Sequence, residues 1–225
     1  MFRRRKFRLK LPSRTLVLGE RTLVMGVLNV TPDSFSDGWL HLDPDAAVER
    51  ALDIERQSAD MIDIGAESTR PGSEGVSVEE ELRRILPVLR KLRGKLKIPL
   101  SVDTSKAEVA EAAAEAGAEI VNDVTGLRGD RRLAELVSRC KLGLVLMHIR
   151  GVPRTMQKGP FARDVMRDVM TGLRRSVAIA RRAGVAESQI VVDPGIGFGK
   201  SYPQNYELLA RLGELSRLGY PLLVG

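Results

Sequence analysis

Short runs of aliphatic and β-branched residues recur along the chain, and segments with helical spacing separate them. The runs span residues 23–28, 61–64, 100–102, 120–121, 143–147, 190–192 and 221–224. Apolar runs of this length, bounded by polar residues, predict buried strands. Strands that alternate with helices predict a parallel sheet whose crossovers are right-handed.

Polar residues mark where several of the helices are expected to begin. Asp43 followed by Pro44 is typical of an N-cap with proline in the first turn. Ser77 and Ser105 each stand three residues before a glutamate, which is the spacing of a capping box. Apolar residues recur at every third or fourth position over 165–180, so a helix is expected there.

Polar residues near the ends of the apolar runs decide between two fold types. Six successive runs carry an amide, an acid or an imidazole: Asn29, Asp63, Asp103, Asn122, His148 and Asp193. These groups would ring one pocket in a barrel, because all βα loops of a barrel open on one face. An open doubly wound sheet binds ligands at one switch point instead, and no G-x-G-x-x-G follows the first run. We therefore expect an α/β fold of the (β/α)8 TIM-barrel type.

The expected barrel has two parts of unequal size. Residues 1–22 are expected to form a basic arm and a β-hairpin, with the hairpin over 7–18 acting as a plug under the sheet. Residues 23–225 are expected to form the barrel domain with only seven strands, so this domain lacks the eighth unit of a barrel of about 250 residues.

The net charge of +7 lies in the first 22 residues. These hold eight of the 36 Lys and Arg and one of the 29 Asp and Glu, which leaves 28 of each in the remainder. Aromatic residues make up only 4% of the chain, too few for a base-stacking surface, so a nucleic-acid partner is disfavoured. One cysteine and the lack of a signal-peptide or membrane-span pattern favour a soluble, cytoplasmic protein.

The segment IVVDPGIGFGKS (190–201) ends like a phosphate-binding P-loop. The P-loop pattern requires glycine at the position of Pro194, and proline has no N–H to offer a phosphate. ATP binding through this segment is therefore disfavoured.

The ring of polar groups suits a flat, hydrogen-bonding heterocycle. Asp103 or Asp193 could accept two parallel N–H bonds from an amino-pyrimidinone edge, and Asn122 offers a donor and an acceptor on one planar group. Other interpretations stay open, because an Asp after a strand is also a common N-cap and Asn122–Asp123 also fits a turn. A hydrogen-bonded structural role is favoured for His148.

Two polar loops supply the rest of the expected site, NVTPDSFSDG (29–38) and ESTRPGSEG (67–75). Arg70 with Thr69 and Ser68 forms a compact anion-binding set, because the arginine fork matches phosphate oxygens. Asn29 offers a neutral oxygen to a hard cation such as Mg²⁺. A metal clamp on a phosphorylated group beside a heterocycle pocket indicates group transfer with loss of phosphate or pyrophosphate.

Long motifs of the chain closely resemble those of the dihydropteroate synthase family. These are MGVLNVTPDSFSDG (25–38) and DIGAESTRPGSE (63–74), followed in order by SVDTSK, AEIVNDVTG, LVLMHIRGVPRTMQ and VVDPGIGFGKS. The resemblance covers nearly the whole chain from position 16. It implies a barrel enzyme of folate biosynthesis, a transferase that joins 6-hydroxymethyl-7,8-dihydropterin diphosphate to p-aminobenzoate. The products are 7,8-dihydropteroate and pyrophosphate.

The resemblance also implies site residues, a cofactor and a partner. The pterin would be held by Asp103, Asn122, Met147 and Asp193. The diphosphate would be held by Asn29, Thr69 and Arg70, with Asn29 also binding Mg²⁺ and with Asn29 and Arg70 in catalytic roles. The p-aminobenzoate site, which sulfonamide drugs imitate, would be walled by Pro71 and Phe198, and a mobile loop would carry Asp33, Ser34 and Phe35. The family suggests a homodimer.

The chain departs from the family pattern at two places. Trp39 stands where a second glycine usually follows SDG. The sequence ends at PLLVG, where the family continues S-R-K-S-F and later adds Arg-x-His, so we expect these 225 residues by themselves to be inactive. Two alternatives remain: a pterin-dependent methyltransferase, which would not use TPDSFSDG or STRPG, and a non-catalytic pterin-binding barrel or basic-armed binding protein, whose RNA binding would fall steeply with salt.

Overall fold

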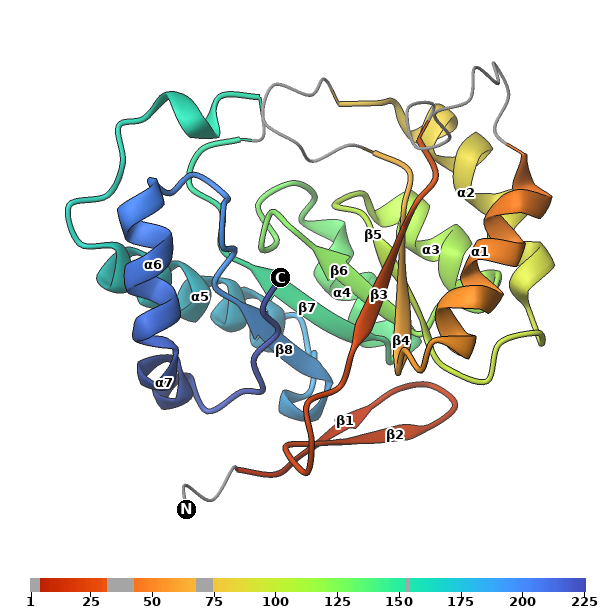
Figure 1. The fold of residues 1–225 in the computed structure, drawn as a ribbon, viewed down its shortest axis with the longest axis horizontal. Helices are drawn as coiled ribbons and strands as arrows, with labels where there is room; N and C mark the ends of the chain where they lie inside the picture. Colours follow the sequence, from red (N-terminus) through yellow and green to blue (C-terminus); the bar gives the residue numbers. More distant parts are fainter. Residues whose placement is uncertain (1–4, 32–42, 68–74, 153) are drawn as a thin grey trace.

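The computed structural model describes residues 5–31, 43–67, 75–152 and 154–225. Within these residues, six parallel strands form one sheet in chain order, and helices cover its outer side (Figure 1). The strands are β3 (Met25–Asn29), β4 (Met61–Gly65), β5 (Leu100–Asp103), β6 (Ile120–Asp123), β7 (Gly143–Met147) and β8 (Ile190–Asp193). The expected α/β class and the parallel strand order are confirmed.

The helices begin close to the expected residues, with one exception. They are α1 (Pro44–Arg56), α2 (Val78–Leu92), α3 (Ala107–Glu115), α4 (Arg132–Cys140), α5 (Val165–Arg182), α6 (Tyr202–Ala210) and α7 (Leu212–Leu215), with short 3-10 turns η2 (Met156–Lys158), η3 (Glu187–Gln189) and η4 (Ser216–Leu218). Asp43 and Ser77 cap α1 and α2 as predicted. The cap predicted at Ser105 is wrong, because α3 begins at Ala107 and its first N–H donates to Asp130 Oδ2, 3.1 Å away.

Alternate residues of the strands face two separate cores. Outward-facing residues such as Ile62 and Leu144 pack under the helices. Inward-facing residues such as Met61 and Val145 pack against Leu9 of the N-terminal hairpin. This hairpin, β1 (Phe7–Lys10) and β2 (Thr15–Leu18), pairs antiparallel and lies beneath the sheet in Figure 1. The hairpin therefore closes the end of the sheet interior where the strands begin, as a plug was expected to do.

The seventh strand expected over 221–224 is reduced to one parallel bridge between Leu222 and Val192. Val192 N donates to Pro221 O and Leu223 N donates to Val192 O, each at 3.0 Å. Pro221 has no N–H to extend this ladder. Over the described residues the sheet therefore stays open between β3 and β8, and Val27 of β3 is 62% exposed. None of the described helices is long and apolar enough to cross a membrane.

Candidate active site

Four neighbouring strands place a residue at or next to their carboxyl ends in one row. Asn29 pairs in register with Gly65, Gly65 with Asp103, and Asp103 with Asn122. Residues that pair in register on parallel strands point to the same side of the sheet. A Cβ on Gly65 would lie 3.4 Å from Asp103 Oδ2 and 3.6 Å from Asn29 Oδ1. Because Gly65 lacks that atom, Asn29 and Asp103 face the same open space.

Asp63 supports this row from the layer below. Asn122 Nδ2 donates to Asp63 Oδ2 at 2.7 Å, so the amide of Asn122 is held in one orientation. Asp63 is buried, and burial raises the pKa of its carboxyl. Asp63 was expected among the polar groups around the pocket, and its observed role is to orient Asn122.

The surroundings of Asp103 strongly disfavour a negative charge on its carboxyl. Burial raises the pKa of its carboxyl well above the usual range, and repulsion from Asp63 and Glu81 raises it further. A carboxyl that retains its proton can both donate and accept hydrogen bonds. Asp103 is therefore suited to the edge of a neutral heterocycle.

Asp193 ends β8 and pairs in register with Met147 of β7. Its side chain is buried, and burial raises the pKa to about 6, against the opposing effects of the Gly195 N–H and the Lys200 charge. The Gly195 N–H donates to Asp193 Oδ1 at 2.6 Å. One carboxylate oxygen is thus engaged by the protein, and the group ionises near neutral pH.

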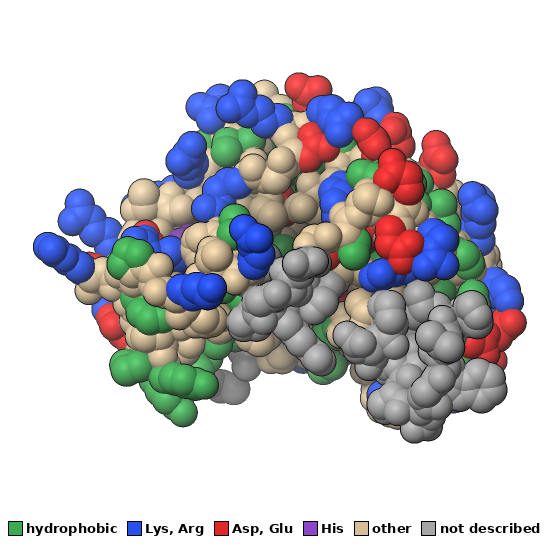
Figure 2. Space-filling view, turned by 90° about the horizontal axis from the view of Figure 1, so that it is seen from above, with side chains coloured by type: hydrophobic (Ala, Val, Ile, Leu, Met, Phe, Trp, Pro, Cys, Tyr) green, Lys and Arg blue, Asp and Glu red, His purple; other side chains and the backbone are tan. Residues whose placement is uncertain are grey.

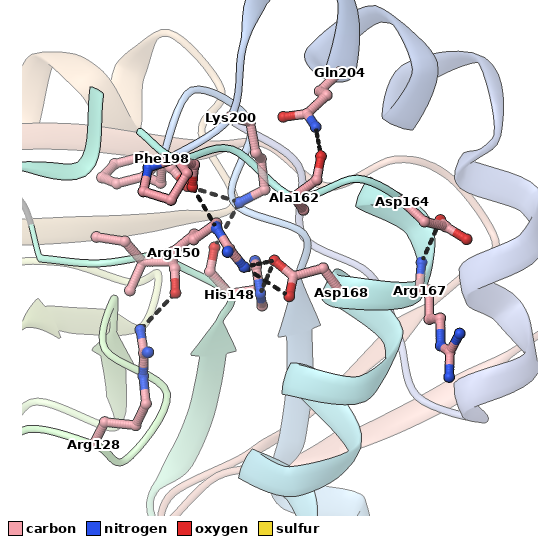
Figure 3. Close-up of polar contacts among 12 residues, drawn as sticks. Arg128, His148, Arg150, Ala162, Asp164, Arg167, Asp168, Phe198, Lys200 and Gln204 are labelled. Carbon is pink, nitrogen blue, oxygen red and sulfur yellow. Dashed lines mark hydrogen bonds and ion pairs between the residues drawn. The ribbon is translucent and has the colours of Figure 1, made fainter. Parts of the chain in front are cut away.

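Lys200, which sequence reasoning did not assign to the site, is buried and connects two loops. It is only 3% exposed, and its Nζ donates to the carbonyl oxygens of His148 and Phe198 at 2.9 Å each (Figure 3). Burial lowers the pKa of its ammonium to about 7. Lys200 therefore connects the loop after β8 to the residue that follows β7. Its ammonium binds backbone carbonyls here, whereas the lysine of a P-loop binds phosphate.

Met147 and Phe198, which are expected to contact the two substrates, belong to one apolar region of the structure. Met147 belongs to a small buried cluster against which Phe198 packs; the other members are Val124, Ile149 and Met156. This cluster provides an apolar surface next to Asp193, on which a flat ring could pack.

His148 is the one member of the expected ring that lies elsewhere. Its imidazole packs against Gly172 of α5, where an added Cβ would come within 2.4 Å of His148 Cδ2. Its Nε2 lies 3.6 Å from Asp168 Oδ2, and burial lowers the pKa of the imidazole to about 3. Successive residues of a strand point to opposite sides, so residue 148 faces away from the side that Met147 faces. The structural role favoured for His148 agrees with this position, and the expectation of six groups around one pocket is wrong here.

A cluster of charges that sequence reasoning missed supports the second loop. Lys106 Nζ donates to Glu81 Oε2 at 2.6 Å and also to Glu67, which stands two residues before Thr69 of the expected diphosphate site. Glu81 is fully buried. Arg84 Nη1 donates to Ala66 O at 2.9 Å. The sequence pattern around Lys106, Ser105 followed by Glu108, predicted only a helix cap and gave no sign of this charge cluster.

Several residues assigned by resemblance lie outside the described residues. They are Asp33, Ser34, Phe35, Thr69, Arg70 and Pro71, together with the atypical Trp39.

The oxygen and nitrogen atoms near Asn29 suit a magnesium ion with few protein ligands better than a metal ion held entirely by protein side chains. No group of three or more His, Cys, Asp or Glu that could hold a metal occurs among the described residues. Asn29 offers one exposed amide oxygen beside Asp103. Mg²⁺ keeps several waters and binds substrate phosphates together with one or two protein oxygens. A single amide therefore fits a Mg²⁺ ion that arrives with a phosphorylated substrate.

Comparison with known proteins identifies the family. The pterin binding enzyme family matches residues 25–225. A dihydropteroate synthase of Clostridium beijerinckii is 44% identical over 217 residues, which cover 96% of this chain and 78% of that protein. The structure of Xanthomonas albilineans dihydropteroate synthase with 4-aminobenzoic acid matches with a TM-score of 0.90 and 44% identity, covering 98% of this chain and 78% of that one. The same enzyme in complex with 7,8-dihydropteroate matches with a TM-score of 0.84 and 42% identity, covering 97% and 77%. This chain belongs to the dihydropteroate synthase family of pterin-binding enzymes.

Proposed function

We propose that the pterin of the dihydropteroate synthase reaction binds on the inner side of the sheet, at Asp103, Asn122 and Asp193. The observation that carries this assignment is the convergence, at the carboxyl ends of three strands, of the buried carboxyl of Asp193, the partly buried carboxyl of Asp103 and an amide held in one orientation. Polar groups that converge in a concave, largely apolar site set the orientation of a ligand. Met147 gives the ring an apolar surface on the same side.

Asp103 and Asp193 divide the recognition between them. The oxygens of Asp103 accept from a ring N–H, and the raised pKa of this carboxyl favours the protonated form, whose O–H can donate to a ring nitrogen or oxygen. Asp193 ionises near pH 6, so at neutral pH it accepts N–H bonds from the amino-pyrimidinone edge. A buried site that lacks either partner leaves a polar group of the ligand unpaired, which costs about 1–3 kcal/mol.

Asn29 is proposed to hold the diphosphate end of this substrate with Mg²⁺, together with Thr69 and Arg70. When bound, Mg²⁺ neutralises charge on the departing diphosphate. The bond from the pterin methylene carbon to oxygen breaks, pyrophosphate leaves, and the amine of p-aminobenzoate forms the new C–N bond and then loses a proton to water. Stabilising the leaving charge is the main task of the protein, so the site requires no strong general base.

Phe198 and Pro71 are proposed to wall the p-aminobenzoate site. Phe198 packs against the cluster that contains Met147, so an aromatic amine beside Phe198 would lie next to the pterin. The carbonyl of Phe198 accepts from Lys200 at 2.9 Å, which fixes the backbone that carries this ring.

A crystal soaked with 6-hydroxymethylpterin tests the pterin assignment. The ring should lie against Met147 and within hydrogen-bonding distance of Asp103, Asn122 and Asp193. A ring bound on the outer side of the sheet would contradict the proposal.

Calorimetry with pyrophosphate and Mg²⁺ tests the role of Asn29. The Asn29→Ala variant should need at least about tenfold more Mg²⁺ to bind pyrophosphate, since even groups that only support a metal ligand alter affinity by 10–100-fold. An unchanged Mg²⁺ requirement would remove Asn29 from the site.

We also propose that the chain works as a homodimer in the cytoplasm. Helix α6 exposes Tyr202, Tyr206 and Leu209, which are 85%, 71% and 44% exposed and share one helical face. Hydrophobic side chains gather at the lower left of Figure 2, on the side where α6 lies. An exposed apolar patch of this kind indicates a protein interface. Light scattering should give a dimer for the chain and a monomer for Tyr206→Glu; a monomer for both would contradict the proposal.

A further inference from the structure

A cavity lies on the side of the sheet that α5 covers; its lining includes Met147 but none of Asn29, Asp103, Asn122 and Asp193. It has a volume of about 490 Å³ and lies between the loops that follow β6 and β7 and the first half of α5. Its polar lining consists of Arg128, His148, Arg150, Asp168, Arg175 and the hydroxyl residues Thr125, Thr155, Thr171 and Ser176. Three guanidinium groups thus line one cavity with one carboxylate.

The arginines of this cavity are incompletely neutralised. Arg150 Nη1 lies 3.2 Å from both carboxylate oxygens of Asp168, so that pair is balanced (Figure 3). Arg128 donates to the carbonyl oxygens of Thr125 and Ile149 at 2.9 and 2.6 Å, and neither acceptor carries a charge. Burial lowers the pKa of Arg128, the negative charges of Asp123 and Asp168 oppose this shift, and the positive charge of Arg175 adds to it. An anion between Arg128 and Arg175 would relieve that repulsion.

His148 adds an independent sign of a ligand. It is only 9% exposed, yet its Nδ1 is buried and has no hydrogen-bond partner among the described residues. Buried polar atoms normally have a partner. Gly172 leaves the space in which the imidazole lies, because a Cβ there would clash with the ring. His148 thus lines the cavity and carries a ring nitrogen whose hydrogen-bonding capacity is not used among the described residues.

We infer that this cavity binds a phosphate-type anion between Arg128 and Arg175. The planar fork of arginine matches phosphate oxygens, and its charge-assisted hydrogen bonds are among the stronger ones in proteins. The threonine hydroxyls offer further donors. This position is separate from the proposed diphosphate site at Asn29, which lies on the inner side of the sheet. Free phosphate and the pyrophosphate released by the reaction share the required chemistry.

Titration of the isotope-labelled chain with inorganic phosphate, and separately with pyrophosphate, tests the site by NMR. Saturable shifts are expected for amides in 125–128, 148–151 and 168–176. Arg175→Gln should weaken the binding that these shifts report by at least about tenfold, since a charge-assisted hydrogen bond contributes about 1.5–3 kcal/mol. Arg174→Gln is the matched control: its side chain is the exposed neighbour on α5 and does not line the cavity.

The two anions distinguish the sources of the ligand. Shifts in these amides with pyrophosphate alone assign the site to the reaction product, and shifts with both anions assign it to phosphate in general. Anion-induced shifts confined to residues of the inner site would overturn the inference. Equal affinity of the Arg175→Gln and Arg174→Gln variants would also overturn it.

Discussion

Replacing Lys106 with methionine should destabilise the fold by about 3 kcal/mol. The change keeps most of the apolar stem and removes the ammonium that donates to Glu81 and Glu67. Glu81 is 0% exposed, and its Oε1 has no hydrogen-bond partner among the described residues. Removing one partner of a buried ion pair costs about 3–5 kcal/mol, because the remaining charge is buried and uncompensated. Lys106 itself is 23% exposed, which places the expected cost at the lower end of that range.

Two controls separate this penalty from general effects of losing a lysine. Lys91→Met breaks an exposed pair with Asp45, whose side chains are 44% and 70% exposed. Such surface pairs contribute about 0–1 kcal/mol, so this variant should stay close to the parent. The double variant Lys106→Met with Glu81→Gln should recover part of the loss, because it removes the uncompensated charge.

Urea unfolding at pH 7, followed by circular dichroism, measures these differences. With a slope of about 2 kcal/mol per molar urea, a loss of 3 kcal/mol lowers the midpoint by about 1.5 M. If Lys106→Met shifts the midpoint no further than Lys91→Met, the buried pair does not anchor the start of the second loop and the reasoning fails.

Three further predictions concern the pH dependence of the site, in binding and in stability, and the packing of helix α5. Pterin affinity should rise between about pH 5 and 7, because the pKa of Asp193 is raised to about 6 and the ionised form accepts N–H bonds; calorimetry that shows a flat profile would contradict this. The stability of the ligand-free protein should change in the opposite direction. Because folding raises the pKa of the Asp193 carboxyl, the folded state should lose stability as the pH rises from about 4 to 6. Urea midpoints measured across this range should fall accordingly. Gly172→Ala should lower stability by about 1–3 kcal/mol, since its Cβ would lie 2.4 Å from His148, whereas Gly213→Ala, with no atom within 4 Å, should not; equal melting temperatures for the two variants would refute the packing argument.

Much of the fold follows from periodicity alone. The apolar runs place the six strands to within about two residues, and the period of two along each strand separates the helix-facing side from the inner side. Asp103 and Asn122 could be placed side by side from sequence because parallel strands align their carboxyl ends. The turn interpretation for Asp123 also agrees with the structure, since its carboxylate accepts from Thr125 N at 2.8 Å and Leu127 N at 2.6 Å.

The remaining features depend on contacts between segments distant in sequence. Lys106 meets Glu81 and Glu67 only because α2 and the loops after β4 and β5 come together. The cap of α3 comes from Asp130, 23 residues further along the chain, so a local capping rule could not find it. The expectation that His148 lines the pocket is wrong because successive residues at the end of a strand point to opposite sides, and Met147 already points inward.

The affinity of 6-hydroxymethylpterin for wild-type and Asp193→Asn protein tests the central claim most directly. At pH 7.5 the ionised Asp193 accepts N–H bonds, and the asparagine variant replaces one acceptor with a donor. Asp168→Asn is the matched control, since Asp168 lies on the outer side of the sheet with Arg150. Isothermal titration should detect pterin binding to the wild type and to Asp168→Asn, with no detectable binding to a folded Asp193→Asn variant. Parental affinity in the Asp193→Asn variant would contradict the assignment of the inner carboxyls to pterin recognition.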